Sequence, residues 1–461
     1  MAEGKTFNRW LVVIGALVLQ VSLGAVYIWS VFQTPLKEFF KWPEASVTLP
    51  AQIVLACFAL AVIFGGRLQD RFGPRIIATI GGVVLGLGLI LARFSERFTP
   101  GAALVWLVLT FAVLGGIGIG MGYVCPIATC VKWFPDKRGL ITGLAVAGFG
   151  AGAFFFAPLA KGLISVGKYQ LLGASLFSLP KIGVFKTFLT LGIVFLVLVV
   201  AGAQLLRNPP AGYVPAGWTP PARSTSAGPV KQDFGPGEVL KTPQFWLLWL
   251  TYFAGCTAGL QVIMKASPIW ESVRIGATAP EAVNAELVRS VGAAGAMAVS
   301  ILAIFNSLGR IAWGKVSDSL GRKTTLVTMF VICAVAMLVL KFLVTYPLYL
   351  VGICVVGLCF GGFLALYPAV TADYYGSKYY GVNYGLMFSA YGVGGIVGPL
   401  LAAALMRTVS KLSYPATDAT GAAIEKTFVV GNYQTAFLVA GVMCLVAGAV
   451  TLLVRPPKAK V

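Results

Sequence analysis

The chain has 461 residues, of which 58% are hydrophobic and 11% are charged. A soluble domain carries about 25% charged residues, so this composition excludes an ordinary soluble protein and predicts one that crosses a membrane several times. The formal charge of +20 is typical of membrane topology, and no run of Lys and Arg is interleaved with aromatic residues. We therefore expect the lipid bilayer as a partner and no nucleic acid.

Histidine and cysteine usage excludes several kinds of chemistry. The chain contains no histidine, which excludes histidine-based catalysis, histidine zinc sites and histidine proton relays. Its eight cysteines fall inside apolar segments and none forms a Cys-x-x-Cys pair, so neither a disulfide framework nor a metal site is indicated. No arrangement of nucleophile and base is recognisable. We expect no enzymatic activity, no metal and no cofactor.

Twelve apolar segments are long enough to span a bilayer. The first follows MAEGKTFNRW and runs for about 25 residues, which is too long for the apolar core of a signal peptide. We interpret it as a membrane span and not as a cleaved leader. The segments are 10–34, 46–66, 75–93, 102–130, 139–161, 184–206, 243–268, 291–314, 323–342, 345–372, 382–406 and 431–454.

A polar stretch divides these segments six and six. Residues 207–242 are rich in Pro, Gly, Ser and Thr, which is typical of an irregular linker. The predicted fold is an all-α membrane protein with twelve transmembrane helices in two pseudo-symmetric bundles. An N-terminal six-helix bundle is expected over residues 1–206, a cytoplasmic linker over 207–242 and a C-terminal six-helix bundle over 243–461.

The distribution of Lys and Arg predicts the orientation. Basic residues are concentrated in the short loops after the second, fourth and eighth segments, and loops of this kind stay on the cytoplasmic side. They are Arg67, Arg71, Arg75, Lys132, Lys137, Arg138, Lys315, Arg322 and Lys323. We expect both chain ends in the cytoplasm and a multi-pass protein of the plasma membrane, taken as a bacterial inner membrane.

The two halves repeat a loop motif. Gly66-Arg-Leu-Gln-Asp-Arg-Phe-Gly-Pro-Arg75 recurs 248 residues later as Gly314-Lys-Val-Ser-Asp-Ser-Leu-Gly-Arg-Lys323. A second match pairs Gly139-Leu-Ile-Thr-Gly143 with Gly381-Val-Asn-Tyr-Gly385. Two bundles of the same topology imply a pseudo-two-fold axis along the membrane normal and a binding site at the midplane between them.

Arg310 is the most informative single residue, because it lies in an apolar segment eight residues before Asp318. The helical rise places it about 12 Å deeper, near the midplane of a hydrocarbon layer roughly 30 Å thick. An Arg at this depth costs between about 2.5 and over about 10 kcal/mol, so it needs a polar cavity or a partner. Every Asp and Glu falls at a predicted helix end or in a loop, which favours a mobile anion as that partner. The alternative is a side chain that extends to the cytoplasmic surface or bonds neighbouring carbonyls.

The repeated loop motif resembles the signature loop of the major facilitator superfamily. Within that superfamily, three features are similar to the oxalate/formate antiporter family: Trp133-Phe-Pro-Asp-Lys-Arg-Gly139, Thr242-Pro-Gln-Phe-Trp246, and Arg310 ahead of the second signature loop. The resemblance covers nearly the whole chain. It implies twelve helices, alternating access and transport of small carboxylate anions.

The resemblance also assigns residues to a substrate site. The dicarboxylate-exchanging member of the family pairs an arginine with a lysine; the arginine corresponds to Arg310, but Tyr391 stands at the position of the lysine. One cation neutralises one carboxylate, so formate, lactate, pyruvate or glycolate is favoured over oxalate. Asn306 lies one turn from Arg310 and either orients it or packs against another helix. The aromatic positions of the family's cavity correspond to Tyr27, Tyr123, Phe149, Phe360 and Phe388, for which helix packing is the alternative.

Asp70 and Asp318 are expected to serve in gating. Each lies at a cytoplasmic helix end among basic residues, and the resemblance implies that ion pairs there latch the inward gate shut. The residues alone also allow simple solvation of two loop carboxylates. The expected gating residues are Asp70, Arg71, Asp318, Arg322, Gly66 and Gly314.

The expected mechanism is a rocking of the two halves around an anion bound at Arg310. Because an empty site would carry a buried, unpaired Arg through the occluded state, exchange of one anion for another is favoured over net flux. The alternative is a proton-coupled monocarboxylate symporter or exporter. A nutrient sensor on a transporter scaffold is a further alternative, disfavoured because sensors usually carry long cytoplasmic extensions. We expect a monomer.

Overall fold

The structure is a computed structural model that describes residues 8–171, 174–210, 212–215, 233–417 and 423–457. Within these residues, twelve helices are long and apolar enough to cross a membrane. They span Arg9–Ile28, Ser46–Phe72, Pro74–Arg97, Pro100–Trp133, Arg138–Val166, Gly183–Gln204, Pro243–Ile263, Ala285–Leu320, Arg322–Leu340, Tyr346–Tyr375, Tyr380–Ala402 and Gln434–Leu453. The predicted twelve-span, all-α class is confirmed.

The N-terminal half contains the elements before residue 207. Its first helix starts behind Asn8, whose side chain accepts a 3.0 Å hydrogen bond from the Trp10 N–H and so caps the helix. The elements are α1 (Arg9–Leu23), η1 (Gly24–Ile28), α2 (Trp29–Phe40), α3 (Glu44–Phe72), α4 (Pro74–Ala92), η2 (Arg93–Arg97), α5 (Pro100–Leu107), η3 (Val108–Leu114), α6 (Gly115–Trp133), α7 (Arg138–Lys161), η4 (Gly162–Val166), β1 (Lys168–Leu171), β2 (Ala174–Ser178) and α8 (Gly183–Gln204).

The C-terminal half contains the elements after residue 232. Thr242 and Asn284 cap two of its helices through side-chain oxygens that accept from the N–H groups of Phe245 and Leu287. The elements are α9 (Pro236–Val239), α10 (Pro243–Ile263), α11 (Ala266–Gly276), η5 (Pro280–Ala282), α12 (Ala285–Leu320), α13 (Arg322–Leu340), α14 (Tyr346–Tyr375), α15 (Tyr380–Leu405), β3 (Arg407–Thr417), β4 (Ala423–Asn432) and α16 (Gln434–Leu453).

The repeated loop motif forms the same turn in both halves. Gly73 ends α3 with φ 87° and ψ 157°, and Gly321 ends α12 with φ 83° and ψ 152°. Positive φ favours glycine because glycine has no Cβ to clash with the backbone. The next helix begins directly after each glycine. The sequence repeat is therefore a repeat of backbone conformation.

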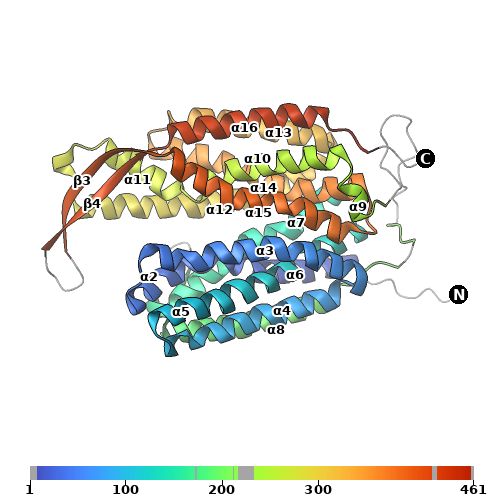
Figure 1. The fold of residues 1–461 in the computed structure, drawn as a ribbon, viewed down its shortest axis with the longest axis horizontal. Helices are drawn as coiled ribbons and strands as arrows, with labels where there is room; N and C mark the ends of the chain where they lie inside the picture. Colours follow the sequence, from blue (N-terminus) through green and yellow to red (C-terminus); the bar gives the residue numbers. More distant parts are fainter. Residues whose placement is uncertain (1–7, 172–173, 211, 216–232, 418–422, 458–461) are drawn as a thin grey trace.

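The two halves lie side by side along their length (Figure 1). They meet along two pairs of helices, α7 with α12 and α3 with α15. We call the end at which α1 begins and α16 ends the terminal face (Figure 1). The opposite end, from which β3 and β4 project, is the hairpin face.

Several element bounds differ from the sequence expectation. The segment predicted as 243–268 is two helices, because the backbone leaves the helical conformation at Lys265 and restarts as α11. Helix α12 begins at Ala285 instead of residue 291, since Asn284 provides a cap further upstream. Two antiparallel hairpins, β1 with β2 and β3 with β4, were not predicted. They lie between helices and leave the class of the fold unchanged.

The described end of the predicted linker is fastened to the C-terminal half. Asp233 Oδ1 accepts hydrogen bonds from the N–H groups of Ser377 at 3.0 Å and Lys378 at 2.9 Å, in the turn between α14 and α15. The short helix α9 follows. Residues 216–232 of the predicted linker lie outside the described residues, and the division at 207–242 stays a prediction.

Candidate functional site

Arg310 lies on α12 with its side chain directed into the other half of the molecule. Its exposed fraction is 1%. Nη1 donates a 2.6 Å hydrogen bond to the main-chain carbonyl of Val146 on α7, and Nε donates a weaker 3.4 Å bond to Asn306 Oδ1. Across the described chain, the hydrogen bonds of this guanidinium reach neutral oxygens and no carboxylate. A buried cation thus remains without a compensating charge.

Glycines on α7 make this position possible. A Cβ at Gly143 would lie 2.1 Å from the main-chain oxygen of Arg310, and one at Gly150 would lie 3.2 Å from its Cζ. Side chains at either position would push α7 away from α12. The Arg310 guanidinium therefore lies beside Gly150, about two turns along α7 from Gly143.

The opposite half has no charge at the corresponding position. With the 248-residue offset of the loop motif, Val62 on α3 corresponds to Arg310. Gly385 on α15 packs there as Gly143 packs on Arg310, since a Cβ at Gly385 would lie 2.9 Å from the Val62 oxygen. The helix packing is pseudo-symmetric and the charge is not.

An aromatic cluster from both halves lies in the same region. The hydroxyls of Tyr27 and Tyr391 are 2.8 Å apart and form a hydrogen bond between η1 and α15. The Tyr27 ring contacts Phe149 edge-on at 5.6 Å, and the Tyr123 ring lies 5.0 Å from Phe149 and 4.9 Å from Phe388. The structure brings five of the six predicted aromatic residues into one cluster. Tyr27 is 37% exposed, so this cluster is not sealed from solvent.

Phe360 is the predicted site residue that the structure places elsewhere. Its ring is buried against Gly259 on α10, where a Cβ would lie 2.4 Å from Phe360 Cδ2. Among the described ring contacts, none joins Phe360 to the aromatic cluster. In this structure Phe360 packs between helices, which is the alternative given for it in the sequence analysis.

Sequence reasoning missed two members of the cluster. Phe58 on α3 lies 5.2 Å from Tyr123 and 5.5 Å from Phe388, and Tyr384 lies 5.7 Å from Phe388. A signal for Tyr384 was present, because the spacing of four between Tyr380, Tyr384 and Phe388 places these rings on one helix face. No comparable pattern marks Phe58.

Asp70 and Asp318 cap helices of the opposite half at the terminal face. Asp70 accepts from the N–H groups of Gly381 at 3.1 Å and Val382 at 2.9 Å, at the start of α15. Asp318 accepts from Gly139 at 2.9 Å and Leu140 at 2.8 Å, at the start of α7. Carboxylates stabilise helix N-termini by satisfying free N–H groups and opposing the helix dipole. These four hydrogen bonds join the two halves at the terminal face.

An ion-pair network adds to this closure. Arg322 bonds Asp318 at 2.7 Å and Asp373 at 2.8 Å, and Arg138 on α7 bonds the other oxygen of Asp373 at 2.8 Å. Sequence reasoning did not identify Asp373 as a member of this network, because Asp373 lies outside both repeated motifs. Arg71 is exposed and lies over the ring of Phe72, with its Cζ 5.2 Å from the centroid. The structure thus draws Arg322 into the network and places Arg71 outside it.

Gly66 and Gly314 allow the halves to touch at this face. A Cβ at Gly66 would lie 2.1 Å from the Gly381 oxygen, and one at Gly314 would lie 2.3 Å from the Gly139 oxygen. Backbone contacts this close leave no space for any other residue. We refer to the contacts of Asp70, Asp318, Asp373, Gly66 and Gly314 as the terminal latch.

Comparison with protein families decides the relationship of this chain to known proteins. Residues 12–283 and 272–461 match the family described as Major Facilitator Superfamily. The chain belongs to the major facilitator superfamily. It is therefore a transporter and not an enzyme.

Individual proteins refine this relationship. The oxalate:formate antiporter of Oxalobacter formigenes is 28% identical over 99% of this chain and 93% of its own length. Monocarboxylate transporter 12 of Xenopus laevis is 24% identical over 94% of this chain and 85% of its own. These relatives are consistent with an oxalate/formate antiporter-type member of the superfamily. The solved structure of the proton:xylose symporter XylE aligns with a TM-score of 0.65 at 12% identity, covering 98% of this chain and 97% of that one, which supports the fold alone.

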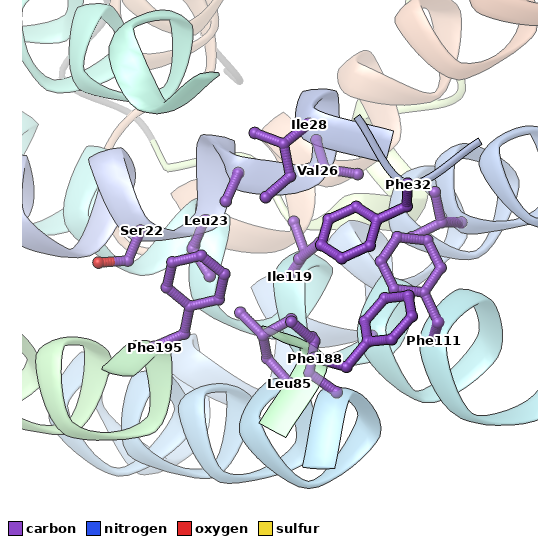
Figure 2. Close-up of a pocket in the computed structure, with 14 residues that line it drawn as sticks. Ser22, Leu23, Val26, Ile28, Phe32, Leu85, Phe111, Ile119, Phe188 and Phe195 are labelled. Atoms are coloured by element: carbon purple, nitrogen blue, oxygen red, sulfur yellow. The ribbon is translucent and has the colours of Figure 1, made fainter. Parts of the chain in front are cut away.

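Two cavities of this facilitator lie away from Arg310. One of about 20 Å³ lies inside the N-terminal half and is lined by apolar side chains such as Phe111, Phe188 and Phe195 (Figure 2). Its polar side chain, Ser22, already donates to the Val18 carbonyl. The other, of about 210 Å³, lies among α11, α14 and β4 at the hairpin face. The first is lined by uncharged side chains, and the second, whose lining includes Lys341, lies at the hairpin face and away from Arg310.

The arrangement around Arg310 suits reversible binding. In the described residues, no group of three or more Cys, Asp or Glu side chains is placed to hold a metal ion. What the site offers is one guanidinium, a pair of phenol hydroxyls and aromatic walls contributed by both halves. Such groups can hold a small anion by charge-assisted hydrogen bonds and release it when the halves separate.

Proposed function

We propose that this transporter carries small monocarboxylate anions by alternating access, with Arg310 as the residue that binds the carboxylate. The observation that carries the proposal is the buried guanidinium at the contact between the two halves, which among the described residues is bonded to a carbonyl and an amide and to no carboxylate. A guanidinium binds both oxygens of a carboxylate in parallel, whereas a lone carbonyl engages one N–H. A carboxylate therefore interacts with Arg310 more strongly than the Val146 carbonyl does, and on arrival it would displace or supplement that contact.

The preference for one carboxylate follows from the charge count. Tyr391 stands where the resemblance places a second cation, and its hydroxyl bonds Tyr27. A dianion would leave one charge unneutralised in a region of low dielectric, which is costly. The names of the two relatives support the substrate class, since one exchanges oxalate and formate and the other is described as a monocarboxylate transporter.

Anion exchange is the favoured mode of transport. In the observed state the cation is already buried and uncompensated, and a buried charge without a counter-charge costs free energy. An anion in the site removes this penalty, so loaded transporters change state more easily than empty ones. We also infer that the terminal latch is the inward gate, with the terminal face and both chain ends in the cytoplasm, because the short basic loops lie there.

The proposal is tested with the purified protein in liposomes. Liposomes loaded with unlabelled lactate, formate or oxalate are diluted into labelled lactate or formate, and the initial rate of uptake is measured. We expect uptake that depends on internal monocarboxylate and is weak with oxalate on either side. Absence of lactate and formate exchange under all loading conditions would contradict the proposed function.

Proton coupling is the second candidate, supported by the hydroxyl pair of Tyr27 and Tyr391 in the site. It predicts uptake into liposomes without internal anion, accompanied by a change of internal pH. A pH-sensitive dye trapped in empty liposomes distinguishes the two modes. Strong net uptake with internal acidification would replace exchange by symport.

A further inference from the structure

Three buried tyrosines of the C-terminal half have hydroxyls without a hydrogen-bond partner among the described residues. They are Tyr252 on α10 and Tyr380 and Tyr384 on α15, each 0% exposed. In the described part of the chain, none of these three oxygens has a hydrogen-bond partner. We call them the inner hydroxyls. An unsatisfied buried donor costs about 1–3 kcal/mol, so three together call for an explanation.

The inner hydroxyls lie in a connected region. Tyr380 and Tyr384 stack with their ring centroids 5.8 Å apart, and Tyr384 continues the stripe to Phe388 at 5.7 Å. The hydroxyls of Tyr123 and Tyr252 are neighbours of the Tyr384 hydroxyl but lie outside hydrogen-bond geometry. The hydroxyls therefore belong to one group and are not three separate packing faults.

Tyr384 lies where the aromatic cluster ends, and Tyr380 lies one helical turn further toward the terminal face. Tyr384 precedes Gly385, which packs at the level of Val62 and hence of the Arg310 backbone, as the pseudo-symmetry of the two halves shows. Tyr391, which bonds Tyr27, lies seven residues further along α15, or about 10 Å nearer the hairpin face. Tyr380, at the start of α15, lies toward Arg138, Asp70 and Asp373 of the latch region, and Tyr252 interacts with Tyr384.

We infer that Tyr252, Tyr380 and Tyr384 form a second, transient station for the carboxylate on its way between Arg310 and the terminal face. This inference rests on the proposed function. A phenol hydroxyl without an acceptor can donate to a carboxylate oxygen, and three such groups can replace part of the water shell of a small anion. The stacked rings provide apolar walls.

The electrostatics of this region favour an anion over a proton. The Arg310 guanidinium interacts with Tyr123, which neighbours Tyr384, and the Arg138 guanidinium interacts with Tyr380, so a cation lies toward each end of the station. The carboxylates at the latch end are engaged: Asp373 by two arginines and Asp70 by two N–H groups. A hydronium ion would be repelled on the Arg310 side, whereas a carboxylate is attracted.

Substitution by phenylalanine isolates the role of the hydroxyls, because the ring is kept. We would compare Tyr252→Phe, Tyr380→Phe, Tyr384→Phe and the triple variant with Tyr349→Phe. Tyr349 is equally buried, but its hydroxyl donates to the Ala266 carbonyl at 2.5 Å. Lactate binding to detergent-solubilised protein, exchange of labelled lactate in liposomes and melting temperature are measured for each.

Loss of the station slows transit and spares the first binding step. We expect the triple variant to exchange lactate about 10-fold more slowly, with less than about a 2-fold change in its Kd. Its melting temperature stays at or above that of the wild type, because no hydrogen bond of the observed state is lost. Tyr349→Phe shows the reverse pattern: a lower melting temperature and a wild-type rate per folded molecule.

Two outcomes would overturn the inference while leaving the proposed function intact. One is a triple variant that exchanges lactate at the wild-type rate, since the hydroxyls would then hold only water. The other is unchanged exchange with a selective loss of lactate-driven acidification, which would assign the hydroxyls to a proton path. A wild-type protein that exchanges neither lactate nor formate would instead contradict the proposed function, and the inference with it.

Discussion

The guanidinium of Arg310 donates a 2.6 Å hydrogen bond to the main-chain oxygen of Val146, which belongs to the opposite half of the molecule. The bond joins α12 to α7, one of the two helix pairs along which the halves meet. The residue proposed to hold the cargo is thus also a direct link between the parts that must move apart. The Arg310 guanidinium would therefore take part both in substrate binding and in the contact between the two halves.

Replacement of Arg310 by alanine should abolish transport and leave the fold intact. A buried charge–carboxylate pair contributes about 3–5 kcal/mol when one partner is removed, which corresponds to at least about a 100-fold loss of exchange. The measurement is lactate exchange in liposomes, with size-exclusion behaviour as the test of folding. Arg310→Lys keeps the charge but loses the planar guanidinium that can bond both carboxylate oxygens, so we expect it to transport little better than Arg310→Ala. Exchange by Arg310→Ala within a few-fold of wild type would exclude Arg310 as the carboxylate site.

Introducing a lysine at Tyr391 should extend the substrate range to dicarboxylates. The new cation would lie in the cluster that contains Tyr27 and could neutralise the second charge of oxalate. We expect oxalate affinity to rise about 10-fold relative to formate, measured by thermal shift or by competition with labelled lactate. Tyr391→Phe is the control, because it removes the hydroxyl without adding charge. If Tyr391→Lys and Tyr391→Phe discriminate equally against oxalate, Tyr391 does not face the substrate.

Neutralising the two latch carboxylates should open the terminal face. Each of Asp70 and Asp318 satisfies two N–H groups at a helix start, and each cap contributes about 1 kcal/mol. We expect Asp70→Asn with Asp318→Asn to raise the population open at this face about 10-fold. The readout is the alkylation rate of a cysteine introduced at Thr142, which is 0% exposed in the closed latch.

The control for the latch is an exposed ion pair at the other end. Glu96→Gln breaks a 3.8 Å contact with Arg93 on the hairpin side and should leave alkylation unchanged. Labelling of the eight native cysteines is subtracted by running each variant without the Thr142→Cys substitution. Equal labelling in the double latch variant and in Glu96→Gln would mean that the two carboxylates do not hold the face closed.

A methyl group at Gly66 should prevent closure of the terminal face. Its Cβ would meet the Gly381 oxygen at 2.1 Å, and backbone atoms on both sides leave no room to relax. We expect Gly66→Ala to lower exchange at least about 10-fold and to raise alkylation of the Thr142→Cys reporter. Gly101→Ala is the matched control, since nothing lies within 4 Å of a Cβ there. Wild-type exchange by Gly66→Ala would show that transport does not require this close contact.

The sequence allowed prediction of those parts of the fold that depend on local patterns. Twelve apolar segments and a repeated glycine-containing loop fix the helices and the turns at Gly73 and Gly321, because hydropathy and positive φ are local properties. The hairpins β3–β4 and β1–β2 were missed because strands that are largely exposed carry little of the hydrophobic pattern that marks the helices. The restart of the chain at α11 was missed for a similar reason, since hydropathy continues across Lys265.

The site residues also fall into those that a local sequence pattern reveals and those that depend on how helices pack. Arg310 was identifiable because a charge at the centre of an apolar segment is rare, and Tyr391 because it departs from a motif. Phe58 and Asp373 were not, since their roles depend on which helices pack together: Phe58 reaches Phe388 across the two halves, and Asp373 bridges Arg138 and Arg322. The packing of Phe360 against Gly259 was likewise not predictable, because correspondence to a cavity position says nothing about which residue the ring contacts.

The pairing of Arg310 with Val62 across the pseudo-symmetry has a consequence for how cargo travels. With the charge on α12 alone, a bound anion would stay attached to the C-terminal half during transport. The N-terminal half would move over it and cover it with carbonyls, phenol hydroxyls and aromatic rings. Binding and enclosure would then be separable tasks: substitutions in the C-terminal half, at Arg310 on α12 or Tyr391 on α15, alter which anion is carried, and substitutions on α3 or α7 alter how fast the halves move.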